Sequence, residues 1–215
     1  MKKTILPIII LLFFINCNKN KEDTDIDYSS FLNSTVPSFS GEKDGVSFNW
    51  EFSWSTFHNS YGMVNGPLEQ YNIDENERII FYSLHEQNNN ILYLPDFCTN
   101  EETYSVINGI DISTPKFNFL TDDLLNSVLN IGKKNIGTFE NGFNFTVYVN
   151  SKKYCPGEYF EGIEILKTEM VAENEAQYIY VWLVLDDIVL VSNEEESSIY
   201  LSNGKIIAKF RLYTD

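Results

Sequence analysis

The stretch VSFNWEFSW, residues 46–54, places an apolar side chain at every second position and a polar one between each pair. Successive side chains of a β-strand point to opposite faces, so this alternation predicts a strand with one face in a core and the other in water. A similar alternation runs over 143–149, after the turn-forming pair Asn141-Gly142. Two half-buried strands of this kind indicate antiparallel sheets.

Other strands are predicted where short β-prone runs lie between turn formers. The segment 177–185 is apolar on both faces, which predicts a central strand that is covered on both sides. Asp186-Asp187 interrupts this run, and 188–192 either continues the strand or returns along it. The remaining predicted strands are 78–85, 91–94 and 163–171.

A hairpin is predicted at the end of the chain. Asn203-Gly204 lies between the β-prone segments 198–202 and 205–213. Both central residues of a two-residue type I′ turn need a positive φ, which Asn and Gly adopt readily. We therefore expect the chain to reverse at 203–204 and the two segments to pair.

One short helix is predicted near 121–131, where the leucines and valines recur at helical spacing. Thr121 can cap its start and Gly132 can end it. Many short strands, frequent turn signals and a single helix predict an all-β, mainly antiparallel fold. A β-sandwich and a barrel-like sheet both satisfy this pattern.

The first residues have the order of a secretory signal. Lys2 and Lys3 give a positive start, residues 5–15 are apolar apart from Pro7, and Cys17 follows before the chain becomes polar. The run has barely half of the about 20 apolar residues that a spanning helix needs. An ordinary signal-peptidase site is also absent, because the chain has no alanine before Ala172.

The segment Phe14-Ile15-Asn16-Cys17 resembles the lipoprotein box of bacterial lipoproteins of the Bacteroides–Flavobacterium type. The resemblance implies cleavage before Cys17, acylation of its thiol, and an exported protein anchored to the outer membrane by lipid. Lys21-Glu22-Asp23 is similar to the segment that directs such lipoproteins to the outer face of that membrane, which implies exposure at the cell surface.

The chain accordingly divides into three parts. Residues 1–16 are expected to be the signal peptide, and residues 17–40 an acylated flexible tether, because they are polar and show no apolar period. Residues 41–215 show no change of composition and no repeat, so we expect one β-rich domain.

The charge balance limits the partners. The chain has 15 Lys and Arg against 31 Asp and Glu, a net charge of −16. Nucleic acid is not expected to bind, because phosphates need basic side chains. Membrane association is expected through the N-terminal lipid alone. The acidity leaves open a role as an inhibitor or immunity partner of a basic protein.

Two cysteines remain beyond the acylated one. Cys98 and Cys155 both lie beside turn formers, and an even pair in an exported protein can form a disulfide. We expect them to be bridged, which would contribute about 4 kcal/mol by the chain-entropy argument. Zinc is not expected, because two isolated cysteines lack the spacing of zinc ligands.

Recognised catalytic motifs are absent from the sequence, including G-x-S-x-G, H-E-x-x-H and the P-loop. His58 and His85 are the only histidines. With an acid they could transfer protons or bind a metal, but such histidines are more often structural. We expect no catalytic residue, metal or cofactor. An envelope hydrolase that uses carboxylates or histidines is the enzyme alternative.

Aromatic residues favour binding instead. The chain has 3 Trp, 13 Tyr and 16 Phe, and an aromatic face with nearby polar groups suits a sugar ring. Trp50 and Trp182 are expected in the core, whereas Trp54 lies at a strand end. Trp54, Tyr61 and His58 are therefore the candidate contacts to a glycan or protein ligand, and the favoured function is a non-enzymatic binding module.

Replacing the expected acylation site tests the anchor. Cys17→Ser should abolish fatty-acid labelling and release the protein from the membrane fraction, since acyl chains supply the membrane affinity. Metabolic labelling and fractionation of both proteins measure this. A mutant that labels and fractionates like the parent contradicts the lipoprotein assignment.

Overall fold

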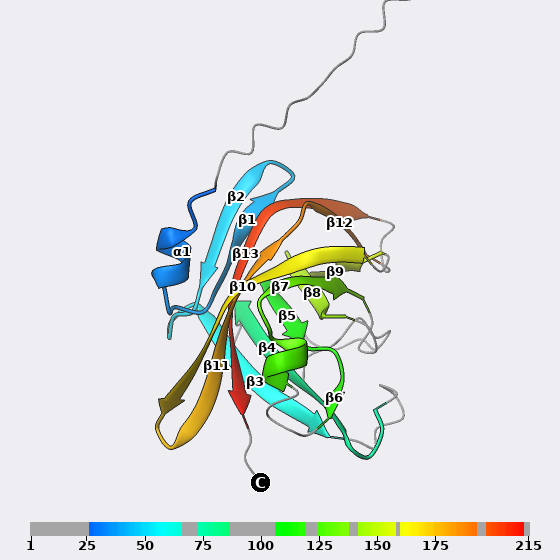
Figure 1. The fold of residues 1–215 in the computed structure, drawn as a ribbon. Coiled ribbons are helices and arrows are strands. Elements are labelled where there is room, and N and C mark those ends of the chain that lie inside the picture. The colour runs from blue at the N-terminus through cyan, green and yellow to red at the C-terminus, as the bar shows by residue number, and fades with distance from the viewer. Residues whose placement is uncertain are drawn as a thin grey trace, which may run out of the picture.

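The computed structural model describes residues 26–65, 73–86, 106–118, 124–137, 142–157, 160–192 and 197–212. Within them the chain is mostly β-strand (Figure 1). Thirteen described strands form one hydrogen-bonded sheet that is folded over on itself but does not close into a barrel. The predicted all-β, mainly antiparallel fold is thus confirmed, in its sandwich-like form.

The elements follow one another along the chain in this order: α1 (Ser29–Asn33), β1 (Ser38–Lys43), β2 (Val46–Glu51), β3 (Phe57–Asn65), β4 (Glu77–Glu86), β5 (Gly109–Ser113), β6 (Phe117–Asn118), the π-helix η2 (Leu124–Val128), β7 (Gly132–Ile136), β8 (Asn144–Val149), β9 (Lys152–Pro156), β10 (Phe160–Glu173), β11 (Ala176–Leu185), β12 (Ile188–Val191) and β13 (Ser198–Leu212).

Two layers arise from the pairing. Sheet A has the order β7-β10-β11-β13-β1-β2. Strand β12 follows β11 and pairs with the same edge of β13. Sheet B has the order β3-β4-β5-β8-β9, with β6 beside β4. The short pairing of β12 with β9 joins the layers. Their inward faces meet in one large apolar core, which contains Leu84, Ile112 and Phe145 of sheet B and Val181 and Phe210 of sheet A.

The predicted hairpin at Asn203-Gly204 is wrong, because β13 runs through this position as one strand of 15 residues. Asn203 does have a positive φ of 54°. The pairs Ser40↔Lys205 and Glu42↔Ser202 leave one β1 residue opposite both 203 and 204, which is a β-bulge. The chain cannot reverse here, since β11 and β12 pair in continuous register along the same edge of β13.

Two-residue turns occur at other places. Asp44-Gly45, Asn150-Ser151 and Asn174-Glu175 each have positive φ at both residues, as type I′ hairpins require. They join β1 to β2, β8 to β9 and β10 to β11. Asp186-Asp187 marks a break after which β12 continues in the direction of β11, which settles the alternative left by the sequence.

The strand predicted at 46–54 ends at Glu51. Beyond it the Phe52 N–H donates to the Pro37 carbonyl, and the Ser53 N–H donates to the Phe57 carbonyl. These bonds draw the chain out of the sheet and into β3. Trp54 consequently lies on a connecting turn.

The folded part begins before residue 41, the expected start of the domain. Helix α1 lies within the expected tether, and its Phe31 and Leu32 pack on the outer face of sheet A. Phe39 of β1 is fully buried. These apolar residues stand singly or in pairs among polar ones, so no period reveals them in the sequence.

The predicted helix near 121–131 is present in its described part as η2, with Leu124 and Val128 buried. Its π geometry differs from the expected α-helix. Residues 1–25, including Cys17, lie outside the described residues, as do Cys98 and the strand predicted at 91–94. No helix in the described ranges is long and apolar enough to cross a membrane.

Substitution of Gly204 tests the bulge. A Cβ there would lie 2.9 Å from Cβ and Cδ1 of buried Leu185. Gly204→Ala should therefore lower the free energy of unfolding by about 1–3 kcal/mol, as overpacking does, measured by urea denaturation. Gly157→Ala is the matched control, because its Cβ would be 3.5 Å from the nearest atom of Val191. Equal stability of the two variants contradicts the crowded bulge.

Candidate functional site

The candidate site is a groove of about 390 Å³ at the seam between the two sheets. Strand β3 is the edge of sheet B, and it approaches β13 without pairing with it. The segment before β1, the β2–β3 turn and the β10–β11 turn complete the walls. The aromatic residues that line the groove are Phe52, Trp54, Tyr61, Tyr178 and Tyr180.

Trp54 is the most exposed large apolar side chain of the described part, with 85% of its surface in water. Its ring packs edge-on against Phe52, with centroids 5.1 Å apart. The turn that carries it is held by the Ser53 N–H···O=C bond to Phe57 and by the Thr56 N–H, which donates to Ser53 Oγ at 3.1 Å. An indole face is thereby presented to solvent on an ordered turn.

Tyr61 of β3 bridges the seam. Its hydroxyl lies 3.2 Å from the hydroxyl of Tyr178 on β11, and the rings meet edge-to-face at 5.2 Å. Partial burial, and then the hydrogen bond to Tyr178, raise the pKa of Tyr61 above its ordinary value. The phenol therefore stays neutral and remains a hydrogen-bonding group at physiological pH.

The ion pair of Lys209 and Glu173 forms the part of the groove wall that β13 and β10 provide. The Lys209 ammonium donates to Glu173 Oε2 at 2.5 Å, and the Tyr180 hydroxyl donates to Glu173 Oε1 at 3.0 Å. Lys209 also lies 4.1 Å from the centroid of the Tyr178 ring, a cation–π contact. The hydrogen bond from Lys209 lowers the pKa of the Glu173 carboxyl. Burial opposes the charge on Lys209, but its bonds to Glu173 and Tyr180 raise the pKa of the amine overall.

The polar groups of the groove can form hydrogen bonds to a ligand. Glu173 is the only acid among its described lining residues, and its two oxygens already accept bonds. Glycoside hydrolysis by the usual route needs two carboxylates. Asn59 and Asn174 also line the groove, and an asparagine side chain offers both an amide donor and an acceptor.

The structure brings together two of the three contacts expected from the sequence. Trp54 and Tyr61 share the groove. His58 does not line it, because even-numbered residues of β3 point to the face opposite to Tyr61. His58 instead stands directly across from His85 of β4.

A buried polar cluster surrounds His85 on the outer face of sheet B. Nε2 of His85 lies 2.7 Å from Oδ1 of Asp111, and the Tyr148 hydroxyl donates to Asp111 Oδ2 at 3.1 Å. His85 and Asp111 are only 5% and 1% exposed. The apolar neighbours of Asp111 in sequence gave no signal of this cluster. Among the described residues no group of three or more His, Cys, Asp or Glu is arranged to hold a metal.

Cys155 lies at the same outer face, beside Thr146, whose hydroxyl oxygen is 3.8 Å from its sulfur. Cys155 is buried and disulfide-bonded. Its expected partner, Cys98, lies outside the described residues, so the pairing of these two cysteines stays a prediction.

Comparison with known proteins adds no relative. No protein-family model matches this chain, and no curated protein or solved structure matches it either. The functional assignment therefore depends on the geometry and chemistry of the groove.

Removal of the Lys209 charge tests the electrostatics of the groove. In Lys209→Met the pKa of Glu173 should rise toward its ordinary value, measured by carbon-detected NMR titration. The wild-type pair stabilises the fold above the ordinary carboxyl pKa, and this contribution is lost as pH falls through the lowered folded-state pKa. Lys133→Met, at an exposed position of the otherwise part-buried strand β7, is the control with the same change of charge. An unchanged Glu173 titration in Lys209→Met contradicts the assigned ion pair.

Proposed function

We propose that the protein is an exported lipoprotein, anchored to the outer membrane through Cys17, whose β-domain binds a glycan in the groove without changing it. One observation carries the proposal. The exposed indole of Trp54 stands at a groove in which three tyrosines, Glu173 and Lys209 are linked to one another by contacts within the protein. The anchor follows from the resemblance of the N-terminal segment to lipoproteins.

The chemistry of a sugar ring matches that of the groove. A pyranose has an apolar C–H face, which stacks on an aromatic ring, and a rim of hydroxyls, which need donors and acceptors. Trp54 offers the stacking face. Glu173, Lys209 and the two asparagines offer the polar partners. The groove volume of about 390 Å³ falls in the range of small-molecule sites.

The charge of the site favours a neutral glycan. The protein has a net charge of −16, so a polyanionic chain is repelled at long range. Within the groove the positive charge of Lys209 is matched by Glu173 at 2.5 Å. No unmatched cation of the described lining residues is left to recognise a sulfate or a uronate.

Binding is favoured over hydrolysis for a similar reason. A hydrolase needs a second carboxylate or an accessible acid–base histidine near the ligand. The groove has one acid among its described lining residues, and the His85–Asp111 pair is buried on a different face. The observed groups can orient a sugar, but none is placed to attack it.

Truncation of Trp54 tests the proposal. Trp54→Ala should weaken binding of a neutral oligosaccharide by about 1–3 kcal/mol, by analogy with aromatic stacking on bases. A panel of soluble neutral oligosaccharides, screened by tryptophan fluorescence and quantified by calorimetry, provides the measurement. The fold should be unchanged, because the side chain is 85% exposed.

Val189→Ala is the matched control, since Val189 is another exposed apolar residue, 54% in water, on β12. It should bind like the wild type. Two results would overturn the proposal: equal affinity of wild type and Trp54→Ala for a bound oligosaccharide, or release of cleaved sugar during the titration.

A further inference from the structure

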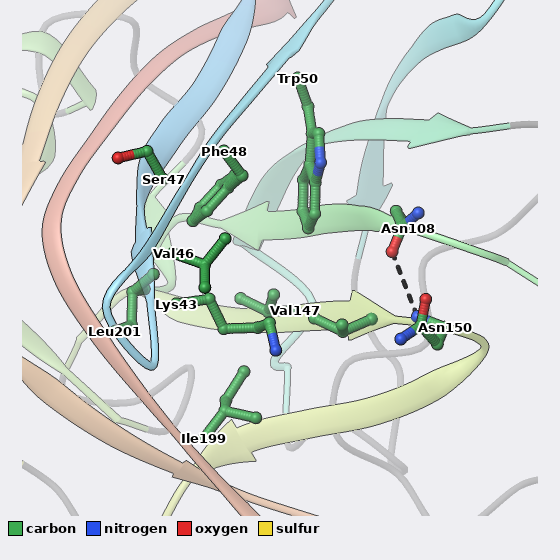
Figure 2. Close-up of a pocket in the computed structure, with 11 residues that line it drawn as sticks. Lys43, Val46, Ser47, Phe48, Trp50, Asn108, Val147, Asn150, Ile199 and Leu201 are labelled. Carbon is green, nitrogen blue, oxygen red and sulfur yellow. Dashed lines mark hydrogen bonds between the residues drawn. The ribbon is translucent and has the colours of Figure 1, made fainter.

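A second pocket lies at the opposite end of β13 from the groove. Lys209 lines the groove, whereas Ile199 and Leu201 line this pocket, whose volume is about 210 Å³. Figure 2 shows the pocket between β2 on one side and β8 on the other. It opens where the β1–β2 hairpin stands away from sheet B, at an end of the sandwich.

The walls are apolar and come from three strands. Val46, Phe48 and Trp50 are alternate residues of β2 and point to the same side, over Val147 of β8 (Figure 2). Val147 and Leu201 are each 1% exposed, so the deep wall is fixed by the core. The rings of Phe48 and Trp50 pack against each other, with their centroids 4.7 Å apart, and form the outer wall of the pocket.

The pocket carries one lysine, Lys43, although the protein as a whole is acidic. The chain has 31 acids, yet none of the described lining residues is acidic, and Lys43 is among them. An ammonium has three donors. Nζ of Lys43 lies 3.4 Å from Oδ2 of the adjacent Asp44. The other carboxylate oxygen, Oδ1, accepts a hydrogen bond from the Tyr200 N–H at 2.8 Å. Lys43 thus retains donors for an anionic group at the mouth.

The volume sets the size of the ligand. A dry apolar cavity of about 150 Å³ holds benzene. The larger pocket here has room for a ring with a short substituent. Asn150 stands at the rim, where its backbone N–H donates to Asn108 Oδ1 at 3.1 Å (Figure 2), so this side of the opening is ordered.

We propose that this pocket binds a small apolar carboxylate, with an aromatic or similar body between β2 and β8 and its carboxylate on Lys43. The apolar walls bury the body, and the charge of the lysine selects an acid over a neutral molecule of the same shape. This site is independent of the glycan groove, because the two share no lining residue.

Phenylacetate is the probe, and the intact protein with labelled methyl groups is titrated by NMR. Saturable shifts should appear at the methyls of Val147, Val149, Ile199 and Leu201. Lys43→Met should weaken phenylacetate binding about fivefold, as a partly exposed ion pair of about 1 kcal/mol predicts. The same variant should bind phenylacetamide, the neutral isostere, as the wild type does. Lys133→Met is the control for net charge.

Each outcome decides the proposal. Absence of saturable shifts up to about 10 mM, a concentration that detects even weak binding, overturns it, as do shifts confined to other methyls. Binding in the pocket that Lys43→Met leaves unchanged overturns the carboxylate selectivity. Trp54→Ala should bind phenylacetate like the wild type. A failure of the glycan experiment therefore leaves this result interpretable, and the reverse also holds.

Discussion

The continuous pairing along β13 is the constraint on which the other elements depend. One edge of this strand pairs with β11 and then β12, and the other pairs with β1 across the bulge at Asn203-Gly204. A bulge adds a residue on one side and bends the strand. Sheet A can therefore curve toward β9 and join sheet B. The pairing of β12 with β9, which joins the two layers, lies just N-terminal to the bulge along β13.

The positions of the groove and of the apolar pocket follow from this geometry. A sheet that folds over but does not close leaves openings where its edge strands stand apart. The groove occupies the seam between edge strand β3 and sheet A, and the apolar pocket occupies the mouth beside edge strand β2. Both openings are lined by aromatic residues of the chain between 48 and 61. Trp50 lies within β2 and is half-buried, whereas Trp54 lies after the end of β2 and is exposed.

Strands β2, β4, β8, β10, β11 and β12 could be predicted from the sequence, because alternation and turn residues are local signals. Strands β1, β3, β5, β6, β7 and β9 were not predicted. The bulge could not be predicted, since Asn-Gly with a positive φ serves a hairpin and a bulge equally well, and only the partners of β13 decide between them. Trp182 was expected in the core and is fully buried. Trp54 and Tyr61 could be proposed as contacts, but their neighbours Glu173 and Lys209 come from distant strands. The burial of His85 with Asp111 depends on what covers sheet B, which no sequence period reports.

The unpaired seam between β3 and β13 has a mechanical consequence. Strand β3 is held by backbone bonds to β4 along one edge, while across the seam the Tyr61 and Tyr178 hydroxyls meet at 3.2 Å. Side-chain contacts yield at lower cost than a ladder of backbone bonds, so local opening concentrates at such boundaries. The groove can therefore widen at this seam more readily than two hydrogen-bonded strands can separate. Its floor lies on β11 and β13, which pair in unbroken register from residue 177 to residue 185 of β11, so the sandwich keeps its shape when the seam opens.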